Sequence, residues 1–125
     1  MKLLNSFYTI KSRDITDSSI RYEIQLDSSH YIYSAHFPDC PITPGVCIIQ
    51  IGKELLEDYL GKKYIIQAVK NVKFLNLISP LEIPVVSYTF DKISSNDIDN
   101  TCKVLIQVSS GETSLAKLSF TCMQK

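Results

Sequence analysis

Residues 43–61 read TPGVCIIQIGKELLEDYLG, and this stretch decides the fold. Thr43 suits a helix N-cap, and Pro44 suits the first helical position because the backbone N–H that proline lacks would have no partner there. Gly61 suits the residue just past the helix end, where the backbone often turns left-handed. The pattern predicts one helix over residues 44–60, about 25 Å long at 1.5 Å per residue.

The two halves of this predicted helix differ in polarity. The first half, VCII followed by Ile51, is apolar on every side and is predicted to be buried. The second half is amphipathic, with one face for the core and one for solvent. The residues predicted to point inward are Leu55, Leu56, Tyr59 and Leu60, and those predicted to face water are Lys53, Glu57 and Asp58.

Alternation of apolar and polar residues predicts strands on both sides of the helix. It is clearest over residues 20–26, 102–108 and 116–122, and the turn SSGE joins the last two into a hairpin. Further segments rich in strand-forming residues are 62–74, 84–90 and a short one at 7–11, whereas the polar stretch 91–101 is predicted to be a loop.

One long helix among five to seven antiparallel strands leaves few possible architectures. The sheet has to curl around the helix to cover it, which gives an α+β domain with one layer on another. At 125 residues the chain is predicted to form a single domain, residues 1–125. Because a curled sheet covers only one side of the helix, we expect a second copy to cover the rest, in a homodimer or a larger assembly of dimers.

The composition is that of a globular chain without a dominant charge. Of its residues, 45% are hydrophobic and 21% are charged, and 13 Lys plus Arg balance 13 Asp plus Glu. This neutrality gives no electrostatic basis for binding nucleic acid. No apolar run reaches the ~20 residues that span a bilayer, and the start MKLLNSFYTIKS is a poor signal peptide. We therefore expect a cytoplasmic protein with no nucleic-acid or membrane partner.

The four cysteines form no Cys-x-x-Cys pair and are expected to be free and mostly buried thiols. They are Cys40, Cys47, Cys102 and Cys122. A zinc site that combined two of them with both histidines would need a spacing that fits no standard finger. No metal ion and no cofactor are expected.

His36 is a candidate catalytic base, and the alternative is a hydrogen-bonded residue of a loop. An imidazole has an unperturbed pKa of ~6.5, so the neutral base is abundant near pH 7. Pro38, Pro41 and Pro44 follow it at intervals of three, and they fix φ along a predicted loop and restrict the movement of its backbone. The other histidine, His30, is predicted to be structural, on a loop or strand edge.

Residues 35–50, AHFPDCPITPGVCIIQ, resemble the signature of the β-hydroxyacyl-acyl-carrier-protein dehydratases of the hotdog fold. Residues 72–90, VKFLNLISPLEIPVVSYTF, are also similar to that family's strand, short loop and second strand. The positions in register with the signature are His36, Phe37, Pro38, Pro41, Pro44 and Gly45.

This resemblance implies a curled antiparallel sheet wrapped around the central helix. It also implies a 3-hydroxyacyl thioester dehydratase of fatty-acid or related lipid or polyene biosynthesis. The partner is an acyl carrier protein or a coenzyme A thioester. In such enzymes the histidine and a helix acid come from opposite subunits and meet in a tunnel for the acyl-pantetheine arm. The residues expected to contact substrate are Phe37, Pro44, Gly45 and Val46.

Gln50 stands fourteen positions after His36, where the family carries glutamate or aspartate. An amide can hold a water or the substrate hydroxyl in place, but it cannot give up a proton at neutral pH. Glu54 lies one turn further on the same helix face. Either the acid and the amide have exchanged positions 50 and 54, or Glu54 is an ordinary solvated residue. The predicted catalytic set is therefore His36, Gln50 and Glu54.

Gly45 opens the predicted helix, where amides lack intrahelical partners and the dipole is positive. Its N–H is a candidate oxyanion donor for a thioester carbonyl, and a packing glycine is the alternative. Two other functions keep the fold: a degenerate dehydratase that binds an acyl carrier or pairs with an active paralogue, and an acyl thioesterase. A basic rim for an acidic carrier is a further possibility, formed by Lys53, Lys62, Lys63, Lys70 and Lys73.

Overall fold

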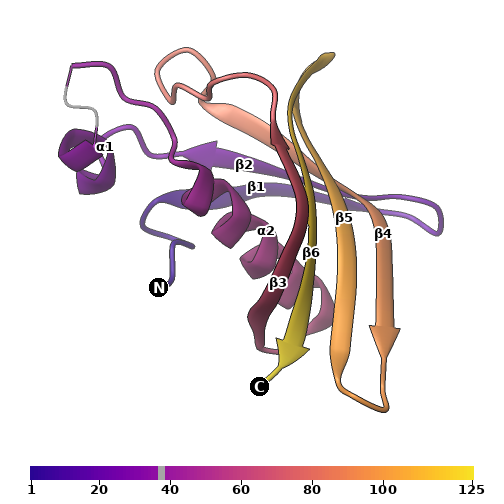
Figure 1. Ribbon diagram of the computed structural model, residues 1–125. Helices are drawn as coiled ribbons and strands as arrows, with labels where there is room; N and C mark the ends of the chain where they lie inside the picture. The colour runs from indigo at the N-terminus through magenta and orange to yellow at the C-terminus, as the bar shows by residue number, and fades with distance from the viewer. Residues whose placement is uncertain (37–38) are drawn as a thin grey trace.

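A computed structural model of the chain describes residues 1–36 and 39–125, with His36 described by its backbone alone. Six strands and two helices make up the described chain (Figure 1). In order they are β1 (Tyr8–Ile15), β2 (Ile20–Leu26), α1 (Tyr31–His36), α2 (Gly45–Leu60), β3 (Tyr64–Phe74), β4 (Val85–Asn96), β5 (Thr101–Ser110) and β6 (Thr113–Gln124).

The six strands form one antiparallel sheet in the order β1-β2-β4-β5-β6-β3. The sheet curls, and α2 lies along its concave side, whereas α1 lies outside the sheet (Figure 1). The α+β prediction of a curled sheet around one long helix is confirmed. The predicted hairpin is also present as β5 and β6, with Gly111 in a left-handed conformation at φ 57° in the turn.

Helix α2 begins and ends within a residue of the predicted limits. Pro44 is the N-cap, and Gly61 ends the helix at φ 68° with its N–H donating to the Glu57 carbonyl at 2.8 Å. Thr43 was the predicted N-cap, but its hydroxyl pairs with the Tyr33 hydroxyl at 2.9 Å and makes no cap. The predicted glycine stop is confirmed, because only a residue tolerant of positive φ closes a helix in this way.

The inner face of α2 fills the concave side of the sheet. Its buried apolar residues are Cys47, Ile48, Ile51, Leu55 and Leu56. A Cβ on Gly52 would lie 3.1 Å from Ile106 Cδ1 of β5, so the missing side chain lets helix and sheet approach closely. The cysteine prediction is confirmed: all four are free, and only Cys40 is exposed. Burial raises the pKa of the Cys122 thiol to about 12.

Several burial predictions for α2 are wrong, because the sheet covers only part of the helix. Val46 is 65% exposed and Tyr59 is also exposed, although both were predicted to be buried. Lys53 and Glu57 were predicted to face water but are largely covered by the start of β3. There the Glu57 carboxylate accepts a hydrogen bond from the Tyr64 N–H at 2.8 Å.

Two segments differ from the predicted secondary structure. Residues 91–96 of the predicted loop instead continue β4, which pairs with β5 from Lys92 to Asn96, and only residues 97–100 form a turn. Strand pairing satisfies backbone groups whatever the polarity of the side chains. His36 ends helix α1 and does not lie in a loop. His30 lies just before α1, where its Nδ1 accepts the Ile32 N–H at 3.1 Å.

Candidate functional site

The first turn of α2 has backbone donors without acceptors. The N–H groups of Cys47 and Ile48 donate to the Pro44 carbonyl at 3.0 and 3.1 Å. Within the described chain, the N–H groups of Gly45 and Val46 donate to no acceptor. Such amides, at the positive end of the helix dipole, suit a developing negative charge.

Gly45 also allows another chain segment to approach the helix closely. A Cβ added there would lie 2.7 Å from Phe74 Cζ, so the phenyl ring at the end of β3 stands against this glycine. Phe74 itself is half exposed, and it is followed by the exposed residues Leu75 and Leu77. The donors of the helix start therefore lie next to apolar side chains, as a site for an acyl chain requires.

Thr43, just before α2, is held by two hydrogen bonds. Its Oγ1 lies 2.9 Å from the Tyr33 hydroxyl of α1, and burial raises the pKa of Tyr33 to about 12. Its N–H donates to the Ile78 carbonyl at 2.8 Å. Both bonds fix the start of α2 relative to α1 and to the loop between β3 and β4.

The side chain of His36, together with Phe37 and Pro38, lies outside the described residues. The backbone of His36 forms the last residue of α1. The predicted roles of His36 as base and of Phe37 as a substrate contact stay predictions.

Gln50 and Glu54 lie together on one face of α2, as their spacing predicts. Gln50 Nε2 donates to Glu54 Oε2 at 2.7 Å. Glu54 is only 5% exposed, so its interpretation as a solvated helix residue is wrong. Its carboxylate accepts four hydrogen bonds, from the Leu3 N–H, the Leu4 N–H, the Tyr8 hydroxyl and Gln50 Nε2.

The N-terminal segment, residues 1–4, is a part of this site that sequence reasoning missed. Besides the bonds to Glu54, the Met1 carbonyl accepts the other hydrogen bond of Gln50 Nε2 at 2.7 Å. Burial, followed by the negative charge of Glu54, raises the pKa of Tyr8, so the phenol remains a donor. The only sequence signal was the apolar pattern of Leu3, Leu4 and Phe7, which anchors the segment in the core.

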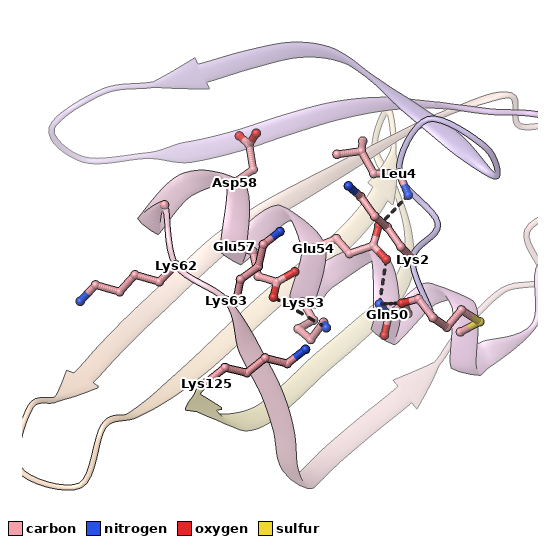
Figure 2. A pocket seen from close by; sticks show the side chains of 12 residues that line it. Lys2, Leu4, Gln50, Lys53, Glu54, Glu57, Asp58, Lys62, Lys63 and Lys125 are labelled. Carbon is pink, nitrogen blue, oxygen red and sulfur yellow. Dashed lines mark hydrogen bonds and ion pairs between the residues drawn. The ribbon is translucent and has the colours of Figure 1, made fainter.

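A cavity of about 680 Å³ opens beside this network (Figure 2). Gln50, Glu54 and the N-terminal segment line one side, and the end of α2 with the chain's C-terminal Lys125 lines the other. Of the predicted basic rim, Lys53, Lys62 and Lys63 line the cavity, whereas Lys70 and Lys73 do not. Lys53 lies 3.8 Å from the Glu57 carboxylate, so the lining carries both signs of charge.

Asp58 lies where the far end of this cavity meets the sheet. Hydrogen bonds from the Arg13 guanidinium, at 2.8 and 2.9 Å, hold the pKa of Asp58 below its ordinary value. The Tyr22 hydroxyl donates to the same carboxylate at 2.6 Å. This cluster ties α2 to β1 and β2.

Two kinds of feature are absent from the described residues. No three His, Cys, Asp or Glu side chains gather closely enough to hold a metal ion. No helix among these residues is long and apolar enough to cross a membrane.

Comparison with known proteins identifies the family. The family model for the ApeI-like dehydratases matches residues 12–121. The 3-hydroxyacyl-[acyl-carrier-protein] dehydratase FabZ of Fusobacterium nucleatum is 31% identical over 94 residues, which cover 71% of this chain and 64% of that protein. FabZ of Clostridium acetobutylicum is 40% identical over 67 residues, which cover 44% of this chain and 48% of that protein. The matched regions thus span about two thirds and half of these relatives.

Solved structures share the fold at low sequence identity. The dehydratase heterocomplex ApeI:P from Xenorhabdus doucetiae contains a chain with a TM-score of 0.64 at 16% identity, covering 91% of this chain and 96% of that chain. A hypothetical thioesterase from Streptococcus pneumoniae, solved with coenzyme A, has a TM-score of 0.63 at 12% identity and covers 94% of this chain and 85% of that one. The sheet and helix are therefore those of the hotdog fold, and the family model decides between these relatives: the chain belongs to the ApeI-like dehydratase family.

Proposed function

We propose that the chain is a 3-hydroxyacyl thioester dehydratase that acts on carrier-bound acyl chains in fatty-acid or related lipid biosynthesis. The observation that carries this proposal is the dehydratase family match over residues 12–121, which contains the His36 segment and the start of α2. The N–H groups of Gly45 and Val46, which have no acceptor among the described residues, supply what the chemistry needs from the backbone.

The proposed reaction removes water across two neighbouring carbons of the acyl chain. The His36 imidazole takes a proton from the carbon beside the thioester carbonyl. The N–H groups of Gly45 and Val46 donate to the carbonyl oxygen while that oxygen gains negative charge. The electron pair then forms the double bond, and the hydroxyl departs from the next carbon as water with the proton that the His36 imidazole had taken up.

The proposed assembly is a homodimer built on the free edge of β3. In the described chain β3 pairs with β6 alone, and its other edge has no partner. Ile65 and Val69 on this strand are exposed, and the first turn of α2 exposes Val46. A second β3 would continue the sheet, as an unpaired edge strand readily does. In the family arrangement, His36 of one copy then faces Gln50 of the other.

The proposed partner is an acyl carrier protein, or coenzyme A carrying the same acyl-pantetheine arm. The names of the FabZ relatives specify acyl-carrier-protein substrates, and the pneumococcal fold relative was solved with coenzyme A. The lysines around the cavity supply positive charge for an acidic carrier or for phosphate groups. Such pathways place the protein in the cytoplasm.

The test is dehydration of a short 3-hydroxyacyl pantetheine thioester, followed by the absorbance of the enoyl product. Wild type should form the enoyl thioester, and His36→Ala should lower kcat/KM by at least ~10²-fold. His30→Asn is the matched control, because it changes the other histidine and keeps an acceptor for the Ile32 N–H. It should retain near-normal turnover.

Two results would contradict the proposal. Release of free thiol without an enoyl product would point to thioester hydrolysis. No turnover by wild type, combined with turnover by Gln50→Glu, would identify a degenerate family member that binds an acyl carrier or works beside an active paralogue.

A further inference from the structure

The orientation of the Gln50 amide is fixed by its two partners. Nε2 lies 2.7 Å from the Met1 carbonyl oxygen and 2.7 Å from Glu54 Oε2 (Figure 2). Both partners are acceptors, so rotating the amide by half a turn would place its oxygen against two other oxygens. Both amide hydrogens are used in these bonds, and the group that remains for a ligand is Oε1, which can only accept.

Glu54 is fixed in turn by donors from the N-terminal segment. The Leu3 and Leu4 N–H groups donate to its two carboxylate oxygens at 2.8 and 2.7 Å, and the Tyr8 hydroxyl donates at 3.0 Å. No lysine or arginine of the described chain forms an ion pair with it. Turning the carboxylate would break bonds in a buried site, which is costly. The carboxylate therefore holds Gln50 in one orientation.

This network forms one side of the cavity beside α2. Gln50 and Glu54 both line it, together with Met1, Lys2 and Leu4 of the N-terminal segment. Gln50 is only partly buried, whereas Glu54 is almost fully buried behind it. A ligand in the cavity would thus meet the amide of Gln50 before the carboxylate of Glu54.

We propose that Glu54 and residues 1–4 are positioning groups that make Gln50 an obligatory hydrogen-bond acceptor for the 3-hydroxyl of the substrate. The inference rests on the proposed function and adds that the site selects acyl chains that carry the 3-hydroxyl. A hydroxyl can donate to Oε1, whereas a saturated or unsaturated chain without the hydroxyl offers no donor there. The site therefore favours the hydroxylated reactant over chains that lack this group.

The expected selectivity is that of one neutral hydrogen bond. Such a bond changes an equilibrium constant by about 3- to 10-fold. A glutamate in place of Gln50 would act differently, because a protonated carboxyl both donates and accepts. The selectivity for the hydroxyl is thus a property of the Gln50 and Glu54 pair.

The experiment measures binding without turnover, in a His36→Ala background. Calorimetry gives Kd for 3-hydroxybutyryl-pantetheine and for butyryl-pantetheine, which differ only in the hydroxyl. The parent should bind the hydroxylated ligand about 3- to 10-fold more tightly. Gln50→Leu should bind both ligands with similar Kd. Glu54→Gln should also lose the preference, with the Kd of butyryl-pantetheine changed by less than about 2-fold.

A double variant, one control and one replacement variant separate positioning from folding. Gln50→Leu combined with Glu54→Gln should lose no more preference than either single change, since both act on one contact. Lys117→Gln, on an exposed residue of β6 outside the cavity, should keep the preference. If Glu54→Gln does not fold, Tyr8→Phe replaces it, because this variant removes one donor of the same carboxylate, and its ratio of Kd values should fall toward one.

The outcomes separate this inference from the proposed function. Equal binding of both ligands by the parent, or a preference that survives in Gln50→Leu or Glu54→Gln, overturns the inference and leaves the dehydratase proposal standing. Binding of neither ligand, together with no turnover by wild type, overturns the proposed function and this inference with it.

Discussion

Glu54 Oε2 lies 2.7 Å from Gln50 Nε2, one helical turn away on α2. The acid that the family pattern places at position 50 is thus present as a neighbour, but it is buried and turned toward the N-terminal segment. All four of its hydrogen bonds are accepted from this chain's own donors. Position 50 therefore carries an amide whose orientation is fixed by Met1 and Glu54, where the family pattern predicts an acid.

Gln50→Glu should raise turnover and lower stability. The new carboxyl can deliver a proton to the departing hydroxyl, a role worth up to ~10²–10⁴-fold. It loses the two donated hydrogen bonds and faces the Glu54 carboxylate, so the free energy of unfolding should fall by about 1–3 kcal/mol at pH 7. Urea unfolding at several pH values checks this: the deficit should shrink as the pH falls and the pair takes up a proton. Gln25→Glu on β2 should show neither effect.

Tyr8→Phe should destabilise the fold through Glu54. The change removes the hydroxyl that donates to the carboxylate at 3.0 Å, and a hydrogen bond to a charged group contributes about 1.5–3 kcal/mol. The free energy of unfolding should fall by that amount in urea titrations. Tyr31→Phe removes a hydroxyl from a residue that is 72% exposed, and it should change the stability by less than about 0.5 kcal/mol. Equal effects of the two changes would show that Glu54 does not depend on the Tyr8 hydroxyl.

Arg13→Gln should lower the free energy of unfolding near neutral pH but not in acid. The guanidinium lowers the folded-state pKa of Asp58, so the pair stabilises the fold above the ordinary carboxyl pKa of ~3.9. This contribution is lost as the pH falls through the lowered value. Because Arg13 is largely exposed, we expect only about 0.5–1 kcal/mol at pH 7. Unfolding measured from pH 7 down to pH 2 should show the two proteins converging, and a constant difference would exclude the ion pair as its cause.

Val69→Lys should weaken the proposed dimer. Val69 is the middle residue of β3, so a two-fold antiparallel pairing centred on the strand would bring it opposite its own copy. Lysines placed there would bring like charges together. Sedimentation equilibrium should show a dissociation constant raised at least ~10-fold. Leu105→Lys is the matched control, since Leu105 is an exposed residue of the central strand β5 and should leave the association unchanged.

The local sequence determined the elements that depend on neighbouring residues. Strand β2 coincides with the predicted 20–26, and α2 begins one residue after the predicted start. Alternation, the proline at the helix start and Gly61 at its end act through backbone conformation within a few residues. Helix α1 was missed because Asp27 and the two serines after it favour turns and gave no helical pattern.

The long helix, the strand pattern and the His36 segment were enough to predict the curled sheet and the family. Only the tertiary structure decided that Glu54 is buried and that the first turn of α2 is exposed. Periodicity shows which helix residues share a face, but not what covers that face. Here residues 1–4 cover Glu54 from a distance of about fifty positions in the chain, while nothing within the described chain covers Val46. Burial depends on contacts between distant segments, and one helix's sequence does not contain them.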